Sequence, residues 1–547
     1  KKLTKQIINE IKQQYKIKYK PGTHARDLGI TFAAAKRRPD QQLKSRNSKS
    51  KVSKVNKIKN LSKISRLARN LYKASAFSSS TWGHQSAGFA KKQVNQLETQ
   101  ALSCSGIPPH GRCRMTALVL SYGPVGHPAA RLTRELMVAW GQLLLEYHHS
   151  GRLKELRAAW NAAKLHIQSA KKLSVNQVRG VMSNVIHQLL SSKWKALNLH
   201  IWKSPQGELV NLLDTKFSFN ILANKIIYSN LKVDAFRAAG HHNGKGFEQG
   251  ICWDATLRLL RSLKGSHTYA YKCALESIMA ATTWSNIRIF NINPDHLPGC
   301  PRCGHHHDDD FHTFWQCPAN ENIVSPSVID TQYLMAAACT QADIEPCLWL
   351  RGILPEKHIE RAMLTKPTSE LKIVYTDPLL AVFGSGTYYG DASGGSFSSY
   401  PPIRRCGCGL GVVNETGDRI WGCRFALPGD AQTVPRAELY VLHVLLLMAK
   451  PNSVIHFVTD NKNNADKFNS GSKAAANSTN CDLFRRIFAD IRNKNITITV
   501  RWMPSHLTEA EERPPGVSLI DIRGNAFADE LAGKAAEFAQ ASLDVST

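Results

Sequence analysis

Hydrophobic positions recur with a helical period through the first half of the chain. In residues 52–71, apolar side chains return every three or four positions, which is the spacing of one helix face, and lysine and arginine lie between them. Similar stretches cover 131–148, 152–172, 175–200 and 254–283, separated by Pro, Gly and His-Asn turns. The pattern predicts mostly helical N-terminal and middle regions, beginning with a basic helix that packs on protein through its apolar face.

The pattern changes after residue 380, where short apolar runs alternate with helical stretches. Strands are predicted to end at Asp391 and to cover 407–413, 419–426, 454–459 and 496–502, and helices to cover 435–449, 481–493 and 524–539. The first pair of complete strands flanks a Gly-Asp turn and therefore forms a hairpin. This order of strands and helices predicts an α/β domain with a mixed five-stranded sheet.

Charge and composition divide the chain further. The chain has 547 residues with 71 Lys plus Arg against 42 Asp plus Glu, and residues 1–75 contribute 22 basic and 3 acidic residues to that balance. Such a local excess is typical of a segment that binds a polyanion, most often nucleic acid, although a solvated basic tail is the alternative. We expect a basic region over 1–100, a helical connection over 101–290, a Cys/His segment over 291–325, a linker over 326–380 and the α/β domain over 381–547.

Two features bear on where such a chain works. No uninterrupted apolar run reaches the ~18 residues of a membrane span, and the N-terminus lacks the apolar core of a signal peptide. The 13 cysteines favour reduced thiols and a metal site over a disulfide framework. We therefore expect an intracellular protein, in nucleus or cytoplasm, rather than a secreted one. Because residue 1 is Lys, we also expect a fragment or a processed product.

Four acids of the α/β region fall where side chains can converge. Asp391 ends the first strand, and Asp460 directly follows the strand 454–459. Glu438 and Asp529 lie in the first turns of two helices. Like charges so close stay ionised only with cations, and such oxygen-rich sites suit Mg²⁺ or Mn²⁺, two of which are the arrangement for phosphodiester hydrolysis. The alternative is that each acid is a helix cap or a solvated surface charge.

Five short motifs in this region stand in one order. They are Tyr389–Gly395, Thr433–Leu439, Val458–Asn461, Trp502–His506 and Gly524–Ala532. Together they resemble the ordered motifs of type 1 ribonuclease H, over about 381–545. The resemblance implies an endonuclease for RNA–DNA hybrids that recognises duplex shape and 2′-hydroxyl groups.

The resemblance also assigns roles to individual residues. It implies that Asp391, Glu438, Asp460 and Asp529 bind the metal ions, and that His506 assists proton transfer or product release. The acidic, Pro-rich stretch from Glu509 to Asp521 is longer than the usual loop of that family and departs from its pattern. This longer loop can reposition His506.

Basic side chains on two helices are candidates for contacts with phosphates. These are Lys54, Lys57, Lys63, Arg66, Arg485 and Arg486. Because they fall on the cationic faces of predicted helices, a solvated helix face is the alternative for each.

Cysteine and histidine cluster between the helical and the α/β regions. The spacing C-x₂-C-x₈-H-x₄-C is formed by Cys300, Cys303, His312 and Cys317. Three thiolates and one imidazole suit tetrahedral Zn²⁺ with a structural role, and buried thiols without metal are the alternative. The three histidines at 305–307 compete with His312 but do not keep its four-residue gap to Cys317. The surrounding sequence resembles the zinc-binding segment downstream of reverse transcriptase in many non-LTR retroelement polyproteins.

Two stretches of the basic region carry a further resemblance. Ala25–Phe32 and Thr81–Gly88 are similar to the end of a retroelement reverse transcriptase, where a strand leaves the palm and the thumb follows. The sequence holds no Tyr/Phe-x-Asp-Asp motif, so the polymerase acids are absent from it.

These resemblances imply one function and leave two alternatives. They imply the C-terminal part of a retroelement polyprotein that cleaves the RNA strand of RNA–DNA hybrids. Its partners would be nucleic acid and the missing polymerase part, with no membrane. A binding scaffold that keeps the ribonuclease H-like fold without activity is the first alternative, and a structural protein that binds folded RNA is the second.

Overall fold

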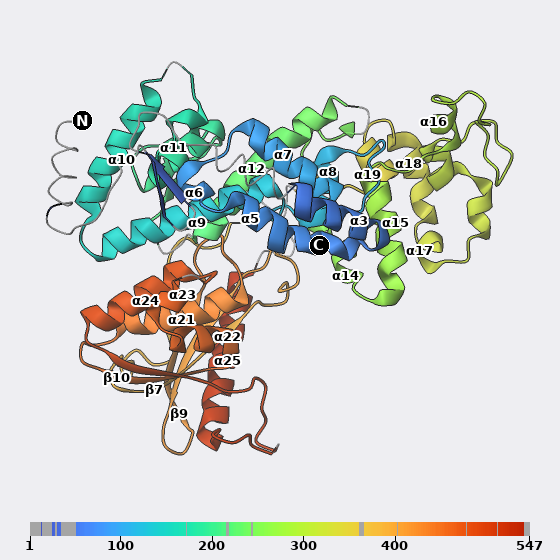
Figure 1. The fold of residues 1–547 in the computed structure, drawn as a ribbon. Helices are drawn as coiled ribbons and strands as arrows, with labels where there is room; N and C mark the ends of the chain where they lie inside the picture. Colours follow the sequence, from blue (N-terminus) through green and yellow to red (C-terminus); the bar gives the residue numbers. More distant parts are fainter. Residues whose placement is uncertain are drawn as a thin grey trace. The chain divides into compact units, whose positions relative to one another are not determined.

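The computed structural model divides the chain into two compact units (Figure 1). It describes residues 13, 24–27, 30–33, 51–170, 172–214, 218–241, 244–359, 366–401, 403–476, 478–510 and 512–540. Unit 1 takes its residues from 1–136, 158–193 and 227–354, and unit 2 takes the remainder, 137–157, 194–226 and 355–547. Among the described residues, no helix is both long and apolar enough to cross a membrane.

Unit 1 is helical. Its helices are α3 (Asn56–Ile64), α4 (Arg69–Leu71), α5 (Ser78–Thr81), α6 (His84–Ala87), α7 (Lys91–Ser103), α8 (Arg114–Tyr122), α11 (Val181–Ser191), α13 (Trp253–Thr256), α14 (Arg258–Ser262), α15 (Tyr269–Met279), α16 (Asn286–Phe290), α17 (Pro326–Ile329), α18 (Met335–Gln341) and α19 (Pro346–Arg351). Three longer helices contribute residues to both units: α9 (Pro128–His149), α10 (Leu153–Gln168) and α12 (Phe219–Ala239).

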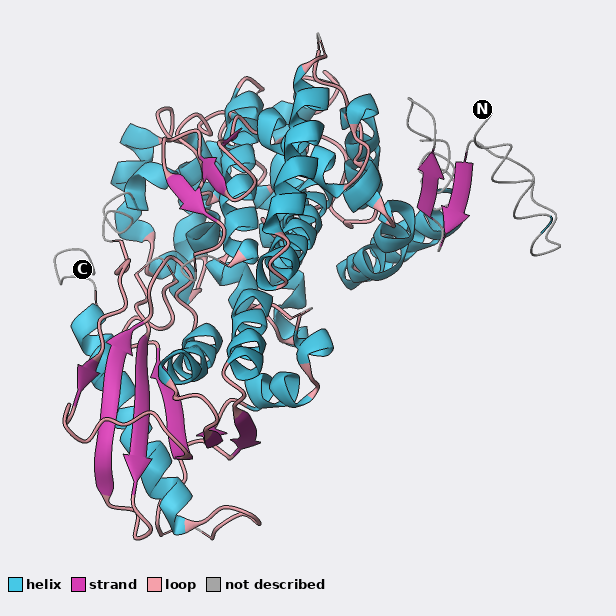
Figure 2. Cartoon of the chain, turned by 90° about the vertical axis from the view of Figure 1, so that its left-hand side faces the viewer, coloured by secondary structure: helices cyan, strands magenta, loops and turns pink. Residues whose placement is uncertain are grey.

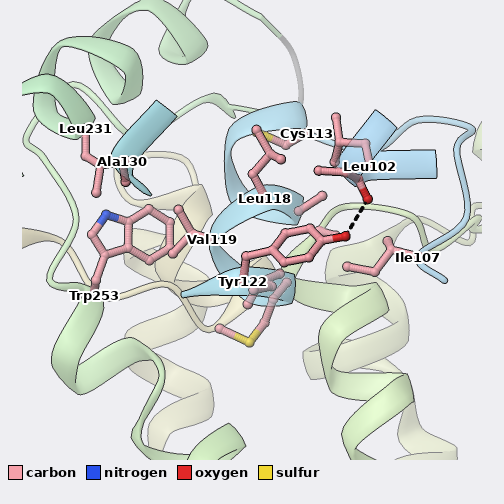
Figure 3. Packing of buried hydrophobic residues seen from close by; sticks show 14 of the residues in the cluster. Leu102, Ile107, Cys113, Leu118, Val119, Tyr122, Ala130, Leu231 and Trp253 are labelled. Atoms are coloured by element: carbon pink, nitrogen blue, oxygen red, sulfur yellow. Dashed lines mark hydrogen bonds between the residues drawn. The ribbon is translucent and has the colours of Figure 1, made fainter. Parts of the chain in front are cut away.

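The core of unit 1 gathers apolar side chains from segments far apart in sequence. Leu118 and Val119 of α8 pack in one cluster with Leu231 and Trp253 (Figure 3). Tyr122 is 4% exposed, and its hydroxyl donates to the carbonyl of Ala101 at 2.7 Å. The buried phenol therefore keeps a hydrogen-bond partner, as burial of a polar group requires.

The basic segment 52–71 is helical, as its periodicity predicts, but it is interrupted. Ser65 is extended (φ −142°), ends α3, and accepts the N–H of Leu67 to start the next turn. Val55 and Ile58 are buried, whereas Ile64 is 85% exposed. The prediction that the apolar face packs on protein is thus confirmed only for its first half.

The N-terminal hairpin lies where the sequence suggested an apolar strand. The strands β1 (His24–Asp27) and β2 (Ile30–Ala33) pair antiparallel. The rest of the basic region before residue 51, apart from Gln13, lies outside the described residues, so the predicted helical character of this part stays a prediction.

The helical stretches expected over 131–148 and 152–172 are confirmed as α9 and α10, whereas the stretch expected over 175–200 is helical only in part. Helix α11 ends at Ser191, and an antiparallel sheet follows, with the order β3 (Lys195–Ala196), β4 (Ile201–Lys203), β5 (Leu209–Asn211). The side chain of Asn198 accepts the N–H groups of residues 200 and 201 and turns the chain between the first two strands.

The helix expected over 254–283 is also divided. It forms α13, α14 and α15, with a break between residues 262 and 269. Gly265 lies within this break, where it interrupts an otherwise helical period.

Unit 2 contains a mixed sheet in the order β11-β10-β7-β8-β9-β6 (Figure 2). The strands are β6 (Val374–Tyr375), β7 (Gly386–Ser393), β8 (Gly407–Val413), β9 (Arg419–Ala426), β10 (Val454–Thr459) and β11 (Thr497–Trp502). β7, β10 and β11 are mutually parallel, and the other neighbours pair antiparallel. The prediction of five strands was wrong, because β6 is too short to show an alternating pattern.

Helices cover both faces of this sheet. They are α21 (Val434–Met448), α22 (Lys462–Asn469), α23 (Ser472–Ala475), α24 (Cys481–Asn493) and α25 (Leu519–Ala539). On β8, Cys408 and Leu410 face the core that α21 and α24 complete, whereas Gly407 and Gly409 face α25. A Cβ at either glycine would lie 2.1 Å from a backbone atom of α25, so glycine is what allows this helix to pack so closely.

Candidate functional site

Three acids from different elements of unit 2 meet in space. Asp391 lies on β7, Glu438 lies in the second turn of α21, and Asp460 directly follows β10. One carboxylate oxygen from each lies within 4.8 Å of those of the other two. The parallel pairing of β7 with β10 brings the first and third together, because the carboxyl ends of parallel strands share one edge.

Polar contacts hold the backbone around two of these acids and the helix that carries the third. Asp391 Oδ1 accepts the N–H of Ala392 at 2.6 Å, and the indole N–H of Trp502 donates to the backbone carbonyl of Asp460 at 2.9 Å. Two residues before Glu438, Arg436 forms a buried ion pair with Asp482 at the start of α24, with N–O distances of 3.1 and 2.7 Å. Both helices are thereby joined next to the carboxylates.

Full ionisation of all three acids at once is unfavourable in this cluster. Burial raises the pKa of Asp391 to about 7, and the charges of Asp460 and Asp529 add to this. Burial raises the pKa of Glu438 to about 9, again with a contribution from the neighbouring acids. The pKa of Asp460 is also raised, mainly by burial. Such shifts arise where like charges converge without a counter-ion.

The donor set fits a divalent cation. Asp391 and Glu438 are 6% and 7% exposed, and the buried Oε2 of Glu438 has no hydrogen-bond partner among the described residues. An unpartnered buried carboxylate oxygen costs free energy unless a cation or a proton satisfies it. Hard oxygen ligands of this kind are those that Mg²⁺ and Mn²⁺ take. Asp391, Glu438 and Asp460 are therefore the residues that would hold a metal here.

Asp529 and His506 lie at the margin of the cluster. Asp529 is exposed on α25 and outside the group of three, although its charge raises the pKa of both Asp391 and Asp460. His506 is exposed in the loop after β11, with a φ of +56°, and its charge acts to lower the pKa of Asp460. Both residues are thus within electrostatic reach of the cluster.

The stretch 509–521 is partly helix rather than loop. Asp521 lies in the first turn of α25, where it forms a capping box with Ser518. Glu509 is held by Arg523 of the same helix, with N–O distances of 2.9 and 3.1 Å. These contacts attach both ends of the stretch to α25.

The Cys/His cluster also assembles. Cys300, Cys303, His312 and Cys317 each offer a ligand atom, all within 4.8 Å of one another. The Sγ atoms of Cys300 and Cys317 are 3.8 Å apart, and Cys303 Sγ lies 3.3 Å from His312 Nε2. His305 stacks on the His312 ring instead of replacing it, with ring centroids 4.7 Å apart.

The backbone of this segment favours a metal-binding loop. The N–H of Cys300 donates to the carbonyl of His305 at 2.7 Å, and Gly304 between them has a φ of +75°. Burial of the Cys300 thiol opposes ionisation, but hydrogen bonds from the backbone N–H groups of Arg302 and Cys303 and from the side chains of His312 and Cys303 together lower its pKa to about 6. A thiolate is the form that binds zinc, so the segment suits this soft ion.

The basic residues singled out in the sequence take different positions. Lys54, Lys57 and Lys63 are exposed in and beside α3. Arg66, in contrast, lies against Glu276 at 3.0 Å and donates to the carbonyl of Cys273 at 2.7 Å. The N–H groups of this guanidinium are therefore engaged inside unit 1.

The two arginines on α24 are both partly buried. Arg486 donates to the carbonyl of Leu213 at 2.6 Å, within unit 2. The buried Nε of Arg485 has no hydrogen-bond partner among the described residues.

Sequence reasoning missed the residues that support the acids. Arg436, Asp482 and Trp502 make the contacts described above, yet each looked unremarkable by residue type. One signal was available, since Arg436 stands among apolar residues at the start of α21, and a buried charge requires a partner.

Comparison with known proteins adds little to this geometry. No family model matches the chain, and no curated protein matches it. Among solved structures, the chain is similar to the "Solution structure of PFV RNase H domain", with 19% identity and a TM-score of 0.22, over 28% of this chain and 95% of that chain. A likeness at this level does not identify a function, which has to come from the site itself.

Proposed function

We propose that the chain is an endonuclease that cleaves the RNA strand of RNA–DNA hybrids by metal-dependent phosphodiester hydrolysis. The observation that carries this proposal is the convergence of Asp391, Glu438 and Asp460 within 4.8 Å, with the first two buried and the third partly buried. The order of the five sequence motifs around these acids supports hybrid cleavage over other two-metal reactions.

Each residue of the site has a part in this reaction. Two bound divalent ions would supply Lewis-acid activation of a water molecule and charge stabilisation of the leaving oxygen. Asp391, Glu438 and Asp460 would hold the ions, and Asp529 would add a further carboxylate from α25. The exposed His506 takes up or delivers a proton at the edge of the site, as its position next to Asp460 allows.

The remaining parts of the chain would serve the same substrate. A structural Zn²⁺ bound by Cys300, Cys303, His312 and Cys317 would hold the segment 291–325 in shape. The exposed lysines beside α3 would contact the phosphates of a hybrid. This arrangement suits the C-terminal part of a retroelement reverse transcriptase polyprotein, with the polymerase part as its partner.

Cleavage of a hybrid labelled differently on its two strands tests the proposal. We expect the full chain to cut only the RNA strand, and to do so with Mg²⁺ or Mn²⁺ but not with EDTA. Asp460→Asn removes a charge needed to hold the ions and is expected to lower the rate at least about a hundredfold.

Asp466→Asn is the matched control, because this exposed aspartate lies on α22 outside the cluster. It is expected to cleave like the unmodified chain. Tight binding of the hybrid without metal-dependent cleavage would contradict the proposal and favour an inactive scaffold. A preference for folded RNA over hybrid would instead favour a structural RNA-binding protein.

A further inference from the structure

Unit 2 contains a groove whose lining includes none of the three clustered acids. Helices α23 and α24 form one wall of an open groove of about 490 Å³, and the C-terminal end of α9 forms the other. The side chain of Gln142 on α9 donates to the carbonyl of Ala476 at 3.0 Å and holds the two walls together. Because α9 precedes the ribonuclease H-like motifs by more than 200 residues, the motifs alone do not define this groove.

The lining of the groove is cationic. Lys473, Arg485 and Arg492 line it, and Glu146 is the one acid among its described lining residues. Asp482, at the start of α24, is paired with Arg436 and does not line the groove. Three permanent positive charges against one carboxylate leave an excess that attracts anions.

The residues around His149 carry the same excess of positive charge. Burial and then the charges of His148, Arg486, Arg492 and Arg485 lower the pKa of His149 to about 4. The ring is therefore neutral at pH 7, and it lines the groove as a polar group that can donate one hydrogen bond. Arg485 also lines the groove, and its buried Nε has no hydrogen-bond partner among the described residues.

The shape of the charged surface suits a chain of phosphates. Arg485 and Arg492 are seven residues apart on one helix, which places them about 10 Å apart along its axis. That separation is longer than a single phosphate group, so the two arginines suit neighbouring phosphates of one strand. Phe488 lies between them in the sequence and stacks on Phe468, with ring centroids 5.0 Å apart, so it gives the groove a rigid apolar floor.

We propose that this groove is a second nucleic-acid contact, which holds the phosphates of one strand outside the carboxylate cluster. It deepens the proposed function by adding a binding site for the same substrate, and it rests on that function for the identity of the polyanion. The binding itself requires neither the metal ions nor cleavage.

Hybrid binding in EDTA, measured by fluorescence anisotropy at several salt concentrations, tests this inference. The full chain is compared with a double variant, Lys473→Ala with Arg492→Ala, in which both altered residues are exposed. We expect affinity near 0.1 M salt to fall on the order of tenfold, and the slope of log K against log salt to become shallower by about two.

A second double variant, Lys372→Ala with Lys450→Ala, removes the same charge from exposed positions of unit 2 outside the groove. It is expected to bind like the unmodified chain. Equal losses in the two double variants would overturn the inference, because they would reflect net charge alone. Inorganic tripolyphosphate that binds in a groove-dependent way, with hybrid binding unchanged, would also overturn it by assigning the groove to a free polyphosphate.

These results are distinct from a failure of the proposed function. An Asp460→Asn chain that does not cleave but binds normally leaves the groove intact. If the unmodified chain cleaves the hybrid and the groove double variant binds it equally well, only the proposed role of the groove is refuted.

Discussion

At the scale of single residues, Glu438 shows what a sequence can and cannot reveal. Its place in the first turns of an apolar helix marked it as a candidate ligand. Its 7% exposure and its unpartnered Oε2 arise only in the folded chain, and its pKa of about 9 comes first from burial and then from the charges of Asp460 and Asp391 on other elements. A carboxyl becomes so perturbed only through neighbours that tertiary structure supplies.

The Cys/His cluster was more predictable, because its ligands are local. The spacing of Cys300, Cys303, His312 and Cys317 within 18 residues already restricts their geometry, and the structure brings all four together. His312, and not the histidines at 305–307, lies with the three cysteines, with its Nε2 at 3.3 Å from Cys303 Sγ.

This local geometry leads to a prediction about zinc. We expect about one zinc ion per purified chain, and about none after Cys300→Ser, since loss of a thiolate opens the tetrahedral set. Metal analysis by mass spectrometry measures it. Cys339→Ser is the control, because Cys339 is exposed on α18 and lies outside the cluster. Equal zinc content in both variants would show that the cluster is not a zinc site.

At the scale of elements, the strands and helices of unit 2 were largely predictable. The observed bounds of β8, β9, β10 and α24 are those that hydrophobic alternation and helical periodicity indicate. The role of the alternating glycines of β8 could not be predicted, because it depends on close packing by α25, which lies more than 100 residues later. The short helices α22 and α23 were also missed, because too few residues show a period there.

The ion pair between Arg436 and Asp482 tests how two of these elements are joined. Both side chains are almost fully buried, so Asp482→Ala leaves an uncompensated charge and is expected to lower the free energy of unfolding by about 3–5 kcal/mol. Replacing both residues, with Arg436→Met and Asp482→Leu, should recover most of the lost free energy of unfolding. Denaturant titration measures these changes.

A matched control is the exposed pair of Arg152 and Glu155, with an N–O distance of 2.6 Å. Glu155→Ala is expected to leave the unfolding midpoint unchanged, because solvent screens this pair. A similar loss in both variants would contradict the account of how α21 and α24 are held next to the carboxylates.

At the scale of the whole molecule, the division into two units could not be read from the sequence. Residues 194–226 belong with the sheet of unit 2, although composition places them in the helical middle region. Contacts such as Arg486 with Leu213 and Asn220 with Thr479 fix this membership across more than 250 residues. Polar contacts over such separations leave no periodic signal in a sequence.

The central claim at this scale is that the buried acids form a divalent-cation site, and calorimetric titration of metal-free chain with Mg²⁺ tests it most directly. At pH 7, Glu438 keeps its proton and Asp391 is about half protonated, given pKa values of about 9 and 7. Bound Mg²⁺ favours the ionised forms, so binding releases these protons and strengthens as pH rises from 6 to 8.

Titration in two buffers of different ionisation enthalpy measures the proton release. We predict binding with release of about one to two protons. Glu438→Gln is expected to lose this binding, whereas Glu415→Gln, at an exposed position in the β8–β9 turn, is expected to keep it. Mg²⁺ binding without proton release, and unchanged in Glu438→Gln, would contradict the account.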